Sequence, residues 1–575
     1  MQIRLKIISL GFLFSILGIL GRLYHWQVVK SSELAAQAKA QHTKKESIDA
    51  LRGNIFAADE SILSSTSVSW LVYAALPELK DDPKTIANQL AMIWVPSESD
   101  EEGYDYQRAL FDEAVRLEGL LSKEDVSWIA LKDRVSDEIK SNIAALGVGG
   151  IGFEPQQSRL YPEASSAAHL LGFVGKDEEG GSTGYFGLEG FYDLTLAGKP
   201  GFRQRESSAL GIPLLSGLWR SSEAIAGVDL VTHIDKTVQF MVEQSLQSAI
   251  ESYGAKSGVI IVMRPSDGAI LGLASYPSFD PSIYWEYGDQ FFKNPAISDS
   301  FEPGSIFKPL VMAAGIDAGE VEPDTKCDIC HEPLKVGKYT IGTWNDEYQK
   351  DATMTEVIVH SDNVGMSFVG LKLGKNKMYQ YLSDYGLGQK TGIDLQGEAS
   401  PSLREKNGWG DIDVATASFG QGIAVTPIQM ITAMSAIAGD GKVVYPQVVD
   451  KLKINGWEQD LEPRFGKQVI SHKAASQVAQ MMVAAAKEGE AKWTAVQGFE
   501  IAGKTGTAQI PVSGHYDAEK TIASFIGFAP ASDPKFLMLV TLREPESSPW
   551  ASETAAPLWF AIAKKLFPYL GVQPE

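Results

Sequence analysis

The sequence is poor in cysteine and in positive charge. Only two of its 575 residues are cysteines, and 72 Asp and Glu residues outnumber 51 Lys and Arg residues, which gives a formal net charge of −21. Such an acidic chain repels a phosphate backbone unless Lys and Arg gather in one place, and no such cluster occurs. We therefore expect no nucleic-acid partner and interpret the acidity as that of a well-solvated surface.

The two cysteines, Cys327 and Cys330, lie in the sequence CDICH. C-x-x-C-H is the pattern of covalent haem attachment, but one short match without a second haem motif is a weak signal. A zinc site needs four ligands, and a second ligand pair is not evident. We expect a local disulfide or two loop thiols, and we expect no metal and no cofactor.

Internal repeats and low-complexity tracts are also absent, whereas the N-terminus is strongly apolar. The apolar run over 7–20 is short for a bilayer, but continued over 7–29 it reaches the roughly 20 residues that a membrane core requires. We predict an uncleaved, single-pass anchor in the inner (cytoplasmic) membrane, with residues 1–6 in the cytoplasm and the chain from about 31 onward outside it. The alternative is a signal peptide, whose nearest cleavage pattern, at 36–38, lies well beyond the apolar run.

The stretch GFEIAGKTGTAQI, residues 498–510, fits two chemical signatures. G-x-x-x-x-G-K-T is the phosphate-binding loop of nucleotide hydrolases, and K-T-G-T is one element of serine acyl-transferases. A phosphate-binding loop needs a buried strand before Gly498 and a helix at Lys504, and the sequence favours neither. We therefore interpret the stretch as a strand edge at which Gly506 lets a substrate approach the backbone.

The second half of the chain has the pattern of an α+β domain. Residues 257–277 form two apolar strands joined by a hairpin turn, and TIASFIGFAP and PKFLMLVTLREP are two more strands after the one at 498–510. Most segments between about 303 and 485 are helical. We predict a domain over 227–575 in which both ends form one antiparallel sheet with helices on both sides.

The region over 31–226 mixes short strands with helical stretches, such as the run LLSKEDVSWIALKDRVSDEIKSNIAALG at 120–147. It carries no convergent set of catalytic residues. We predict that it is a non-catalytic, mixed α/β pedestal domain.

The segment EPGSIFKPL supplies a nucleophile and its base. Serine attacks at neutral pH only with a base in hydrogen-bonding reach, and outside the histidine triads the usual base is lysine. Ser305 is expected to open a helix, which puts Lys308 one turn on and on the same face. The hydroxyl then lies at the positive end of a helix dipole. The other S-x-x-K, at Ser532, contains an Asp-Pro step that disfavours a helix.

Ser361 and Asn363 form a second polar element, Ser-Asp-Asn. The hydroxyl of Ser361 can relay a proton between Lys308 and a leaving amine, and Asn363 can hydrogen-bond an amide of an acyl substrate. Taken alone, Ser-Asp-Asn is more often a turn or a helix cap.

Lys504 begins the third element, Lys-Thr-Gly-Thr. Its charge is expected to lower the pKa of Lys308 and to keep that amine neutral enough to act as a base. The strand edge, with the hydroxyls of Thr505 and Thr507, suits an extended peptide that ends in a carboxylate. In this order and outside the membrane, the three elements together predict acyl transfer.

With these elements the chain resembles the class B penicillin-binding proteins, which are D,D-transpeptidases of peptidoglycan synthesis. The similarity covers nearly the whole chain, with NPAISDSFEPGSIFKP, VIVHSDNVGM, YGLGQKTGIDLQGE, SFGQGIAVTPIQ and IAGKTGTAQ around the active site and RGNIF, SRLYP and GYFGLEGFYDLTLAGKPG in the pedestal. It implies the penicillin-binding, serine transpeptidase fold.

The resemblance also implies a role for each residue. Ser305 takes the acyl group of a D-Ala-D-Ala stem peptide, and an amine of a neighbouring stem then forms the cross-link. β-Lactams acylate the same serine. The implied set is Lys308 as base, Ser361 and Asn363 as relay and amide contact, Lys504, Thr505, Gly506 and Thr507 as the carboxylate site, and the N–H groups of Ser305 and Thr507 as the oxyanion hole.

Two details concern the branch of the family. Elongation-type members tend to have Asp where this chain has Asn363, and the following Val-Gly-Met resembles the septal, FtsI-like branch, whose expected partner is an FtsW-like membrane glycosyltransferase. Family members continue R-G-x-I with Asp-Arg and a glycine, whereas this chain has FAADES at 56–61. That departure concerns pedestal contacts and not the chemistry.

Two other functions compete with a transpeptidase. A class A β-lactamase uses a glutamate in an E-x-x-L-N loop; Glu398 lies in about the right place but is followed by ASPS, and no such loop occurs between Asn363 and Lys504. A non-catalytic division scaffold is expected to have lost Ser305, Lys308 or Lys504, and all three are present. The sequence thus favours the transpeptidase.

Overall fold

The computed structural model describes residues 2–34, 43–97, 104–178, 180–206, 219–454, 456–512 and 515–574. The chain divides into two compact units, one of Met1–Arg52 with Ala197–Gly227 and the other of Gly53–Leu196 with Val228–Glu575. The small-residue cleavage pattern at 36–38 lies outside the described residues.

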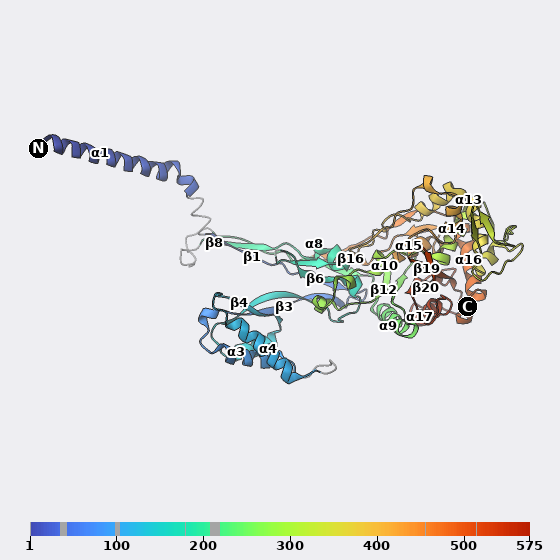
Figure 1. The fold of residues 1–575 in the computed structure, drawn as a ribbon, viewed down its shortest axis with the longest axis horizontal. Coiled ribbons are helices and arrows are strands. Elements are labelled where there is room, and N and C mark those ends of the chain that lie inside the picture. Colours follow the sequence, from blue (N-terminus) through green and yellow to red (C-terminus); the bar gives the residue numbers. More distant parts are fainter. Residues whose placement is uncertain are drawn as a thin grey trace. The chain divides into compact units, whose positions relative to one another are not determined.

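The first unit contains an N-terminal helix and a small sheet (Figure 1). Helix α1 (Gln2–Tyr24) runs into a π-helical turn, and together they form an apolar helix over Ile3–Val29 that is long enough to cross a membrane and has no buried side chain. The predicted N-terminal apolar helix is therefore confirmed. The sheet is antiparallel and consists of β1 (Thr43–Ile48), β8 (Gly201–Glu206) and β9 (Trp219–Ser222).

The second unit is built on a five-stranded antiparallel sheet with the order β12-β11-β21-β20-β19. Its first two strands are the predicted hairpin and its last three come from the C-terminal end, so the predicted sheet is confirmed. The strands are β11 (Ser257–Met263), β12 (Ile270–Tyr276), β19 (Ala502–Val512), β20 (His515–Ala529) and β21 (Phe536–Arg543).

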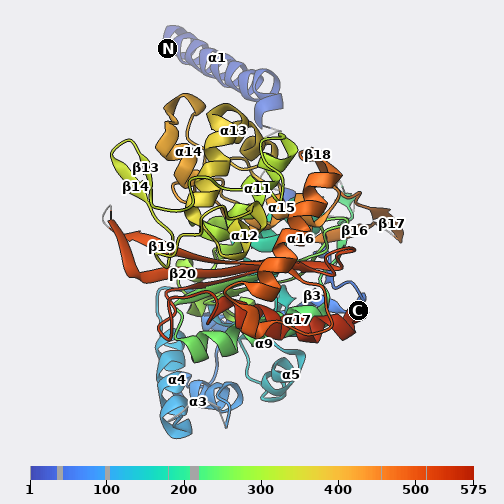
Figure 2. The ribbon, with the colours of Figure 1, turned by 90° about the vertical axis from the view of Figure 1, so that its right-hand side faces the viewer.

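Both faces of this sheet are covered by helices (Figure 2). Successive strand residues point to opposite faces, so Ile260 and Val262 pack in one apolar cluster while Ile261 and Met263 pack in another. One face is covered by α9 (Lys236–Tyr253) and α17 (Ala555–Tyr569), and the other by α10 (Pro295–Ser298), α15 (Pro427–Ala438) and α16 (His472–Glu488). Burial on both faces explains why the strands are continuously apolar.

The remaining helices of this half lie around the first two predicted motifs, and the third motif is on β19. These helices are α11 (Lys308–Asp317), α12 (Met354–Val359), α13 (Asn363–Asp384) and α14 (Asp411–Ala417), with two small sheets, β13 (Leu334–Val336) with β14 (Tyr339–Ile341) and β15 (Lys442–Val444) with β18 (Phe465–Gln468). In the loop after α11, Cys327 and Cys330 form a disulfide, which is the first of the two predicted alternatives.

The pedestal strands continue into strands of the C-terminal half. The mixed sheet has the order β17-β16-β10-β2-β3-β4, with β5 paired to β3, and only β2 and β10 pair in parallel. Its strands are β2 (Ile55–Phe56), β3 (Ile62–Ala74), β4 (Ile129–Val135), β5 (Ile151–Leu160), β10 (Asp229–Thr232), β16 (Val449–Ile454) and β17 (Trp457–Asp460). Hydrogen bonds of this sheet therefore cross the predicted boundary at 226/227, and the domain limits stay a prediction.

Three helices pack on the pedestal strands: α3 (Pro83–Trp94), α4 (Tyr106–Leu121) and α5 (Asp137–Ala145). The prediction that 120–147 is helical was wrong in its middle, where β4 pairs with β3. Leu131 and Val135 of β4 are buried against these helices. A pairing partner far upstream in the chain thus overrides the local helical pattern.

A smaller group of elements connects the pedestal strands to the C-terminal half. It consists of the hairpin β6 (Phe173–Lys176) and β7 (Ser182–Tyr185) and the short helices α6 (Ala168–Leu171), α7 (Gly187–Phe191) and α8 (Asp193–Leu196). An aromatic cluster that includes Phe173, Phe279 and Phe292 ties the hairpin to the segment after β12. The pedestal and the C-terminal half therefore share apolar packing as well as a sheet.

Candidate active site

Ser305 lies in a short 3-10 turn, Gly304–Phe307, and the α-helix begins only at Lys308. We expected Ser305 to open the α-helix, but it lies in the 3-10 turn that precedes this helix. Pro309 has no N–H group and cannot donate to the Ser305 carbonyl, so the N–H of Lys308 makes the tighter 3-10 bond to that carbonyl instead. The half-buried Ser305 side chain still precedes Lys308 by a single turn.

Glycines bring two other segments against this turn. A Cβ on Gly506 of β19 would lie 2.8 Å from Cγ2 of Ile306 and 3.0 Å from its backbone nitrogen, so only glycine lets the strand lie this close. Gly304 has a φ of 56° and donates its N–H to the Gly420 carbonyl at 3.1 Å. Because β19 is at the edge of its sheet, its free side borders Ser305.

Lys308 is fully buried and connects the first two motifs. Its Nζ donates to the Ser361 carbonyl at 2.5 Å, to the Ser361 hydroxyl at 3.1 Å and to Oδ1 of Asn363 at 2.8 Å. Ser361 has a φ of 56°, a left-handed conformation that costs a non-glycine residue about 1 kcal/mol or more. Between Ser361 and Asn363, Asp362 is the N-cap of α13, so the helix-cap interpretation of Ser-Asp-Asn is confirmed. The roles of Ser361 and Asn363 in catalysis stay a prediction.

Lys504 is also buried, with 3% of its surface exposed. Its Nζ donates to the carbonyl of Thr505 at 3.2 Å and to the Thr505 hydroxyl at 3.1 Å. Further along β19, the Thr507 hydroxyl oxygen accepts the N–H of Ala551 at 3.0 Å. That bond fixes the loop after β21 to the strand that carries the motif.

The pKa values of both lysines are lowered, in each case mainly by burial. Burial is the main cause that lowers the pKa of Lys308 well below its ordinary value of 10.5, and the positive charge of Lys504 lowers it further. Sequence reasoning identified the second cause but not the first. Burial also lowers the pKa of Lys504, and the negative charge of Glu490 opposes that shift.

Residues of all three motifs meet in a cleft of about 80 Å³, whose wall does not include Lys308, Lys504 or Gly506. Its walls also contain residues that sequence reasoning missed, above all Glu490, Trp344 and Trp550. The two indole rings lie 5.5 Å apart and are about half exposed, at 48% and 41%. The presence of tryptophans in polar loops is the sequence signal that could have identified Trp344 and Trp550. No sequence signal points to Glu490. The predicted residues on the cleft wall are Ser305, Ser361, Asn363, Thr505 and Thr507.

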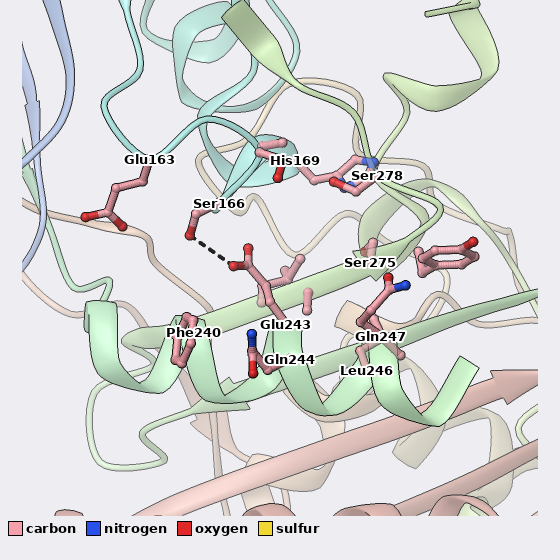
Figure 3. Close-up of a pocket in the computed structure, with 15 residues that line it drawn as sticks. Glu163, Ser166, His169, Phe240, Glu243, Gln244, Leu246, Gln247, Ser275 and Ser278 are labelled. Atoms are coloured by element: carbon pink, nitrogen blue, oxygen red, sulfur yellow. Dashed lines mark hydrogen bonds between the residues drawn. The ribbon is translucent and has the colours of Figure 1, made fainter. Parts of the chain in front are cut away.

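A larger cavity of about 460 Å³ lies elsewhere, between α9, β12 and the pedestal segment 163–169 (Figure 3). Glu243 of α9 accepts hydrogen bonds there from the Ser166 hydroxyl at 2.9 Å, the Ala167 N–H at 2.7 Å and the Gln239 amide at 2.7 Å. Burial raises the pKa of the Glu243 carboxyl. None of the predicted site residues lines this cavity.

Glu398, the residue considered for a lactamase base, is engaged in a turn. Its carboxylate accepts the N–H of Thr391 at 2.6 Å, the Thr391 hydroxyl at 2.7 Å and the N–H of Gly392 at 3.0 Å. It does not line the cleft. Because it accepts three hydrogen bonds from one short segment, this carboxylate stabilises the turn and has a structural role.

Comparisons with known proteins agree over nearly the whole chain. Residues 258–567 match the family described as penicillin binding protein transpeptidase domain, and residues 47–232 match the family described as penicillin-binding protein dimerisation domain. Stage V sporulation protein D of Bacillus subtilis is 31% identical over 563 residues, which cover 96% of this chain and 84% of that protein. Peptidoglycan D,D-transpeptidase FtsI of Buchnera aphidicola is 31% identical over 78% of this chain and 76% of that protein.

Solved structures of penicillin-binding proteins also resemble the chain. Penicillin binding protein 3 of Mycobacterium tuberculosis, in complex with aztreonam, superposes with a TM-score of 0.69 and 26% sequence identity. The match covers 92% of this chain and 98% of that one, so the likeness includes the pedestal as well as the five-stranded sheet.

Proposed function

The chain belongs to the penicillin-binding protein transpeptidase family and is a membrane-anchored, serine-type peptidoglycan D,D-transpeptidase, and we propose that Ser305 is its nucleophile. The observation that carries this proposal is the position of Lys308. The fully buried Lys308 amine, whose pKa is lowered, lies one turn after Ser305. The half-buried Ser305 lines the cleft in which residues of the three motifs meet. A neutral amine in that place is a general base.

In the proposed acylation step, the Ser305 oxygen attacks the carbonyl of the D-Ala-D-Ala bond while Lys308 takes the hydroxyl proton. The carbon–nitrogen bond then breaks, and the proton passes through the Ser361 hydroxyl, 3.1 Å from the Lys308 amine, to the departing D-alanine. Backbone N–H groups of Ser305 and Thr507 stabilise the oxyanion.

In the second step, the amine of a neighbouring stem peptide attacks the acyl-enzyme. A carbon–nitrogen bond forms, the bond to the Ser305 oxygen breaks, and a proton returns to that oxygen. Lys504 and the Lys-Thr-Gly-Thr strand bind the carboxylate of the donor, and Asn363 binds its amide. A β-lactam mimics the donor amide and is held as a stable ester of the same serine.

The setting of the reaction is also part of the proposal. The N-terminal helix, predicted over 7–29, anchors the chain in the inner membrane, with 1–6 in the cytoplasm, the pedestal over 31–226 outside it and the transpeptidase domain over 227–575 beyond. Asn363 and the similarity to FtsI support work at the division septum rather than in elongation. An FtsW-like glycosyltransferase is the proposed membrane partner.

The decisive experiment is covalent labelling of the full-length protein by a fluorescent penicillin. Ser305→Ala is expected to abolish labelling, because no other cleft residue combines a hydroxyl with a base one turn away. Ser278→Ala is the matched control, since this serine lines the larger cavity and is expected to leave labelling unchanged. Undiminished labelling of Ser305→Ala would remove it as the nucleophile.

A further inference from the structure

Glu490 follows directly after α16 and lines the Ser305 cleft. Its Oε2 accepts the Thr505 hydroxyl proton at 2.9 Å, and the same hydroxyl oxygen accepts a proton of Lys504 Nζ at 3.1 Å. Lys504 and Thr505 are 3% and 6% exposed. A carboxylate is thus joined to a buried ammonium by a single hydroxyl group.

The direction of these bonds restricts what Thr505 can do. A hydroxyl has one proton, and here it is donated to Glu490, so the same group cannot donate to the carboxylate of a substrate. Thr507 differs, because its oxygen accepts the Ala551 N–H and its own proton stays available. Carboxylate binding then falls to Lys504 and Thr507, while Thr505 links Lys504 to Glu490.

The two lysines also differ in the groups that surround their amines. A buried cation without a counter-ion tends to lose its proton. The direct partners of Lys308 are neutral oxygens, those of Ser361 and Asn363, whereas Lys504 is one hydroxyl away from a carboxylate. We propose that Glu490 is a positioning residue that, through the Thr505 hydroxyl, holds Lys504 in its charged form beside Ser305.

Other charged groups surround this trio. Asp362, at the start of α13, accepts hydrogen bonds from the N–H groups that it caps. The negative charges of Glu490 and Asp362 both oppose the lowering of the Lys308 pKa, so Glu490 acts on Lys308 as well as on Lys504. The cavity next to the cleft, about 340 Å³, shares Glu490 with it; its other titratable residues are Glu347, Glu356, His360, Asp362, Glu488 and Lys492. Of the carboxylates, Glu490 is the one that both hydrogen-bonds Thr505 and opposes the loss of charge from Lys504.

The consequence is a defined change in the pH dependence of acylation. In the proposed function Lys504 binds the donor carboxylate as a cation, so we expect the acylation rate to fall on the alkaline side as Lys504 loses its proton. Removing the charge of Glu490 lets that loss occur at lower pH, because the pKa of Lys504 is no longer supported. A residue that only packed the cleft would lower the rate at every pH by the same factor.

The test compares Glu490→Gln with the matched control Glu488→Gln, which removes an equal charge from the same segment without touching Thr505. The rate constant of acylation by a fluorescent penicillin is measured on the full-length protein across the neutral and alkaline range. At the pH where the wild-type rate has fallen to half, the Glu490→Gln rate is expected to be lower by about three- to tenfold. The Glu488→Gln curve is expected to coincide with the wild type.

Coincidence of the Glu490→Gln and wild-type curves after scaling would overturn the inference. If Glu490→Gln does not fold, Glu490→Asp, which keeps the charge but shortens its reach, is expected to give a smaller shift in the same direction. This inference rests on the proposed function, but the two fail differently. A wild-type protein that is not labelled contradicts the function, whereas a labelled protein with unshifted curves contradicts only the role of Glu490.

Discussion

The Ser305 cleft and the Glu243 cavity differ in size and in the way in which their titratable groups are held. The cavity is larger, about 460 Å³ against about 80 Å³, and both bury titratable groups. Glu243 accepts three hydrogen bonds, which oppose but do not cancel the effect of its burial on its pKa. At the cleft, the Nζ of buried Lys308 donates to oxygens of Ser361 and Asn363. The Nζ of buried Lys504 donates to oxygens of Thr505, whose hydroxyl in turn donates to Glu490. The two regions therefore differ in the kind of buried charge, two amines against one carboxylate, as well as in volume.

The strongest test of this contrast removes one lysine from each region. Lys308→Gln keeps the volume but removes the base, and loss of a positioned general base typically lowers a rate by about 10²–10⁴. We expect penicillin acylation to fall by that factor. Lys236→Gln, a lysine that pairs with Glu163 at the rim of the cavity, is expected to change the rate by less than about twofold. Equal losses in the two variants would contradict the contrast.

A second test measures whether Glu243 contributes to the stability of the fold and not to penicillin acylation. Glu243→Ala leaves the Ala167 N–H without its acceptor and removes one of the two acceptors of the Gln239 amide, which is expected to lower the free energy of unfolding by about 1–3 kcal/mol. Penicillin labelling at a temperature where the variant is folded should stay at the wild-type level. Denaturant unfolding measures the first quantity, and Glu243→Gln, which retains an acceptor oxygen, is the milder control.

The smallest effect is expected at Glu398. Because its carboxylate is held by Thr391 and Gly392, it cannot direct water at an acyl-enzyme, and Glu398→Gln should leave the lifetime of the penicilloyl adduct unchanged. Because no E-x-x-L-N loop supplies a glutamate for deacylation, the adduct on Ser305 should last minutes or longer. Intact mass spectrometry after removal of free penicillin follows it. Loss within seconds, with repeated turnover, would indicate a lactamase.

The sequence predicted those parts of the molecule that depend on neighbours in the chain. The β11–β12 hairpin follows from its turn residues, and the three motifs could be assigned residue by residue. The 3-10 turn at Ser305 was also open to prediction, because Pro309 lacks the N–H group that an α-helix needs there.

The rest depends on contacts that only the folded chain creates. Ile129–Val135 has a helical pattern locally but pairs with β3. The full burial of Lys308, the main cause of its lowered pKa, comes from the position of α11 between other helices and not from its motif. Glu490 and Trp550 enter the cleft from loops that follow α16 and β21, and no spacing rule connects them to Ser305.

The sheet pairs β11 with β21, opposing Ser257 to Arg543, so its middle cannot close until β21, the last strand of the domain in chain order, has been made. Ser305 and Lys308 are therefore synthesised long before Lys504 exists to complete the site. A fragment that ends before β19 contains the proposed nucleophile but lacks the strand that packs against its turn, and we expect such a fragment not to react with penicillin.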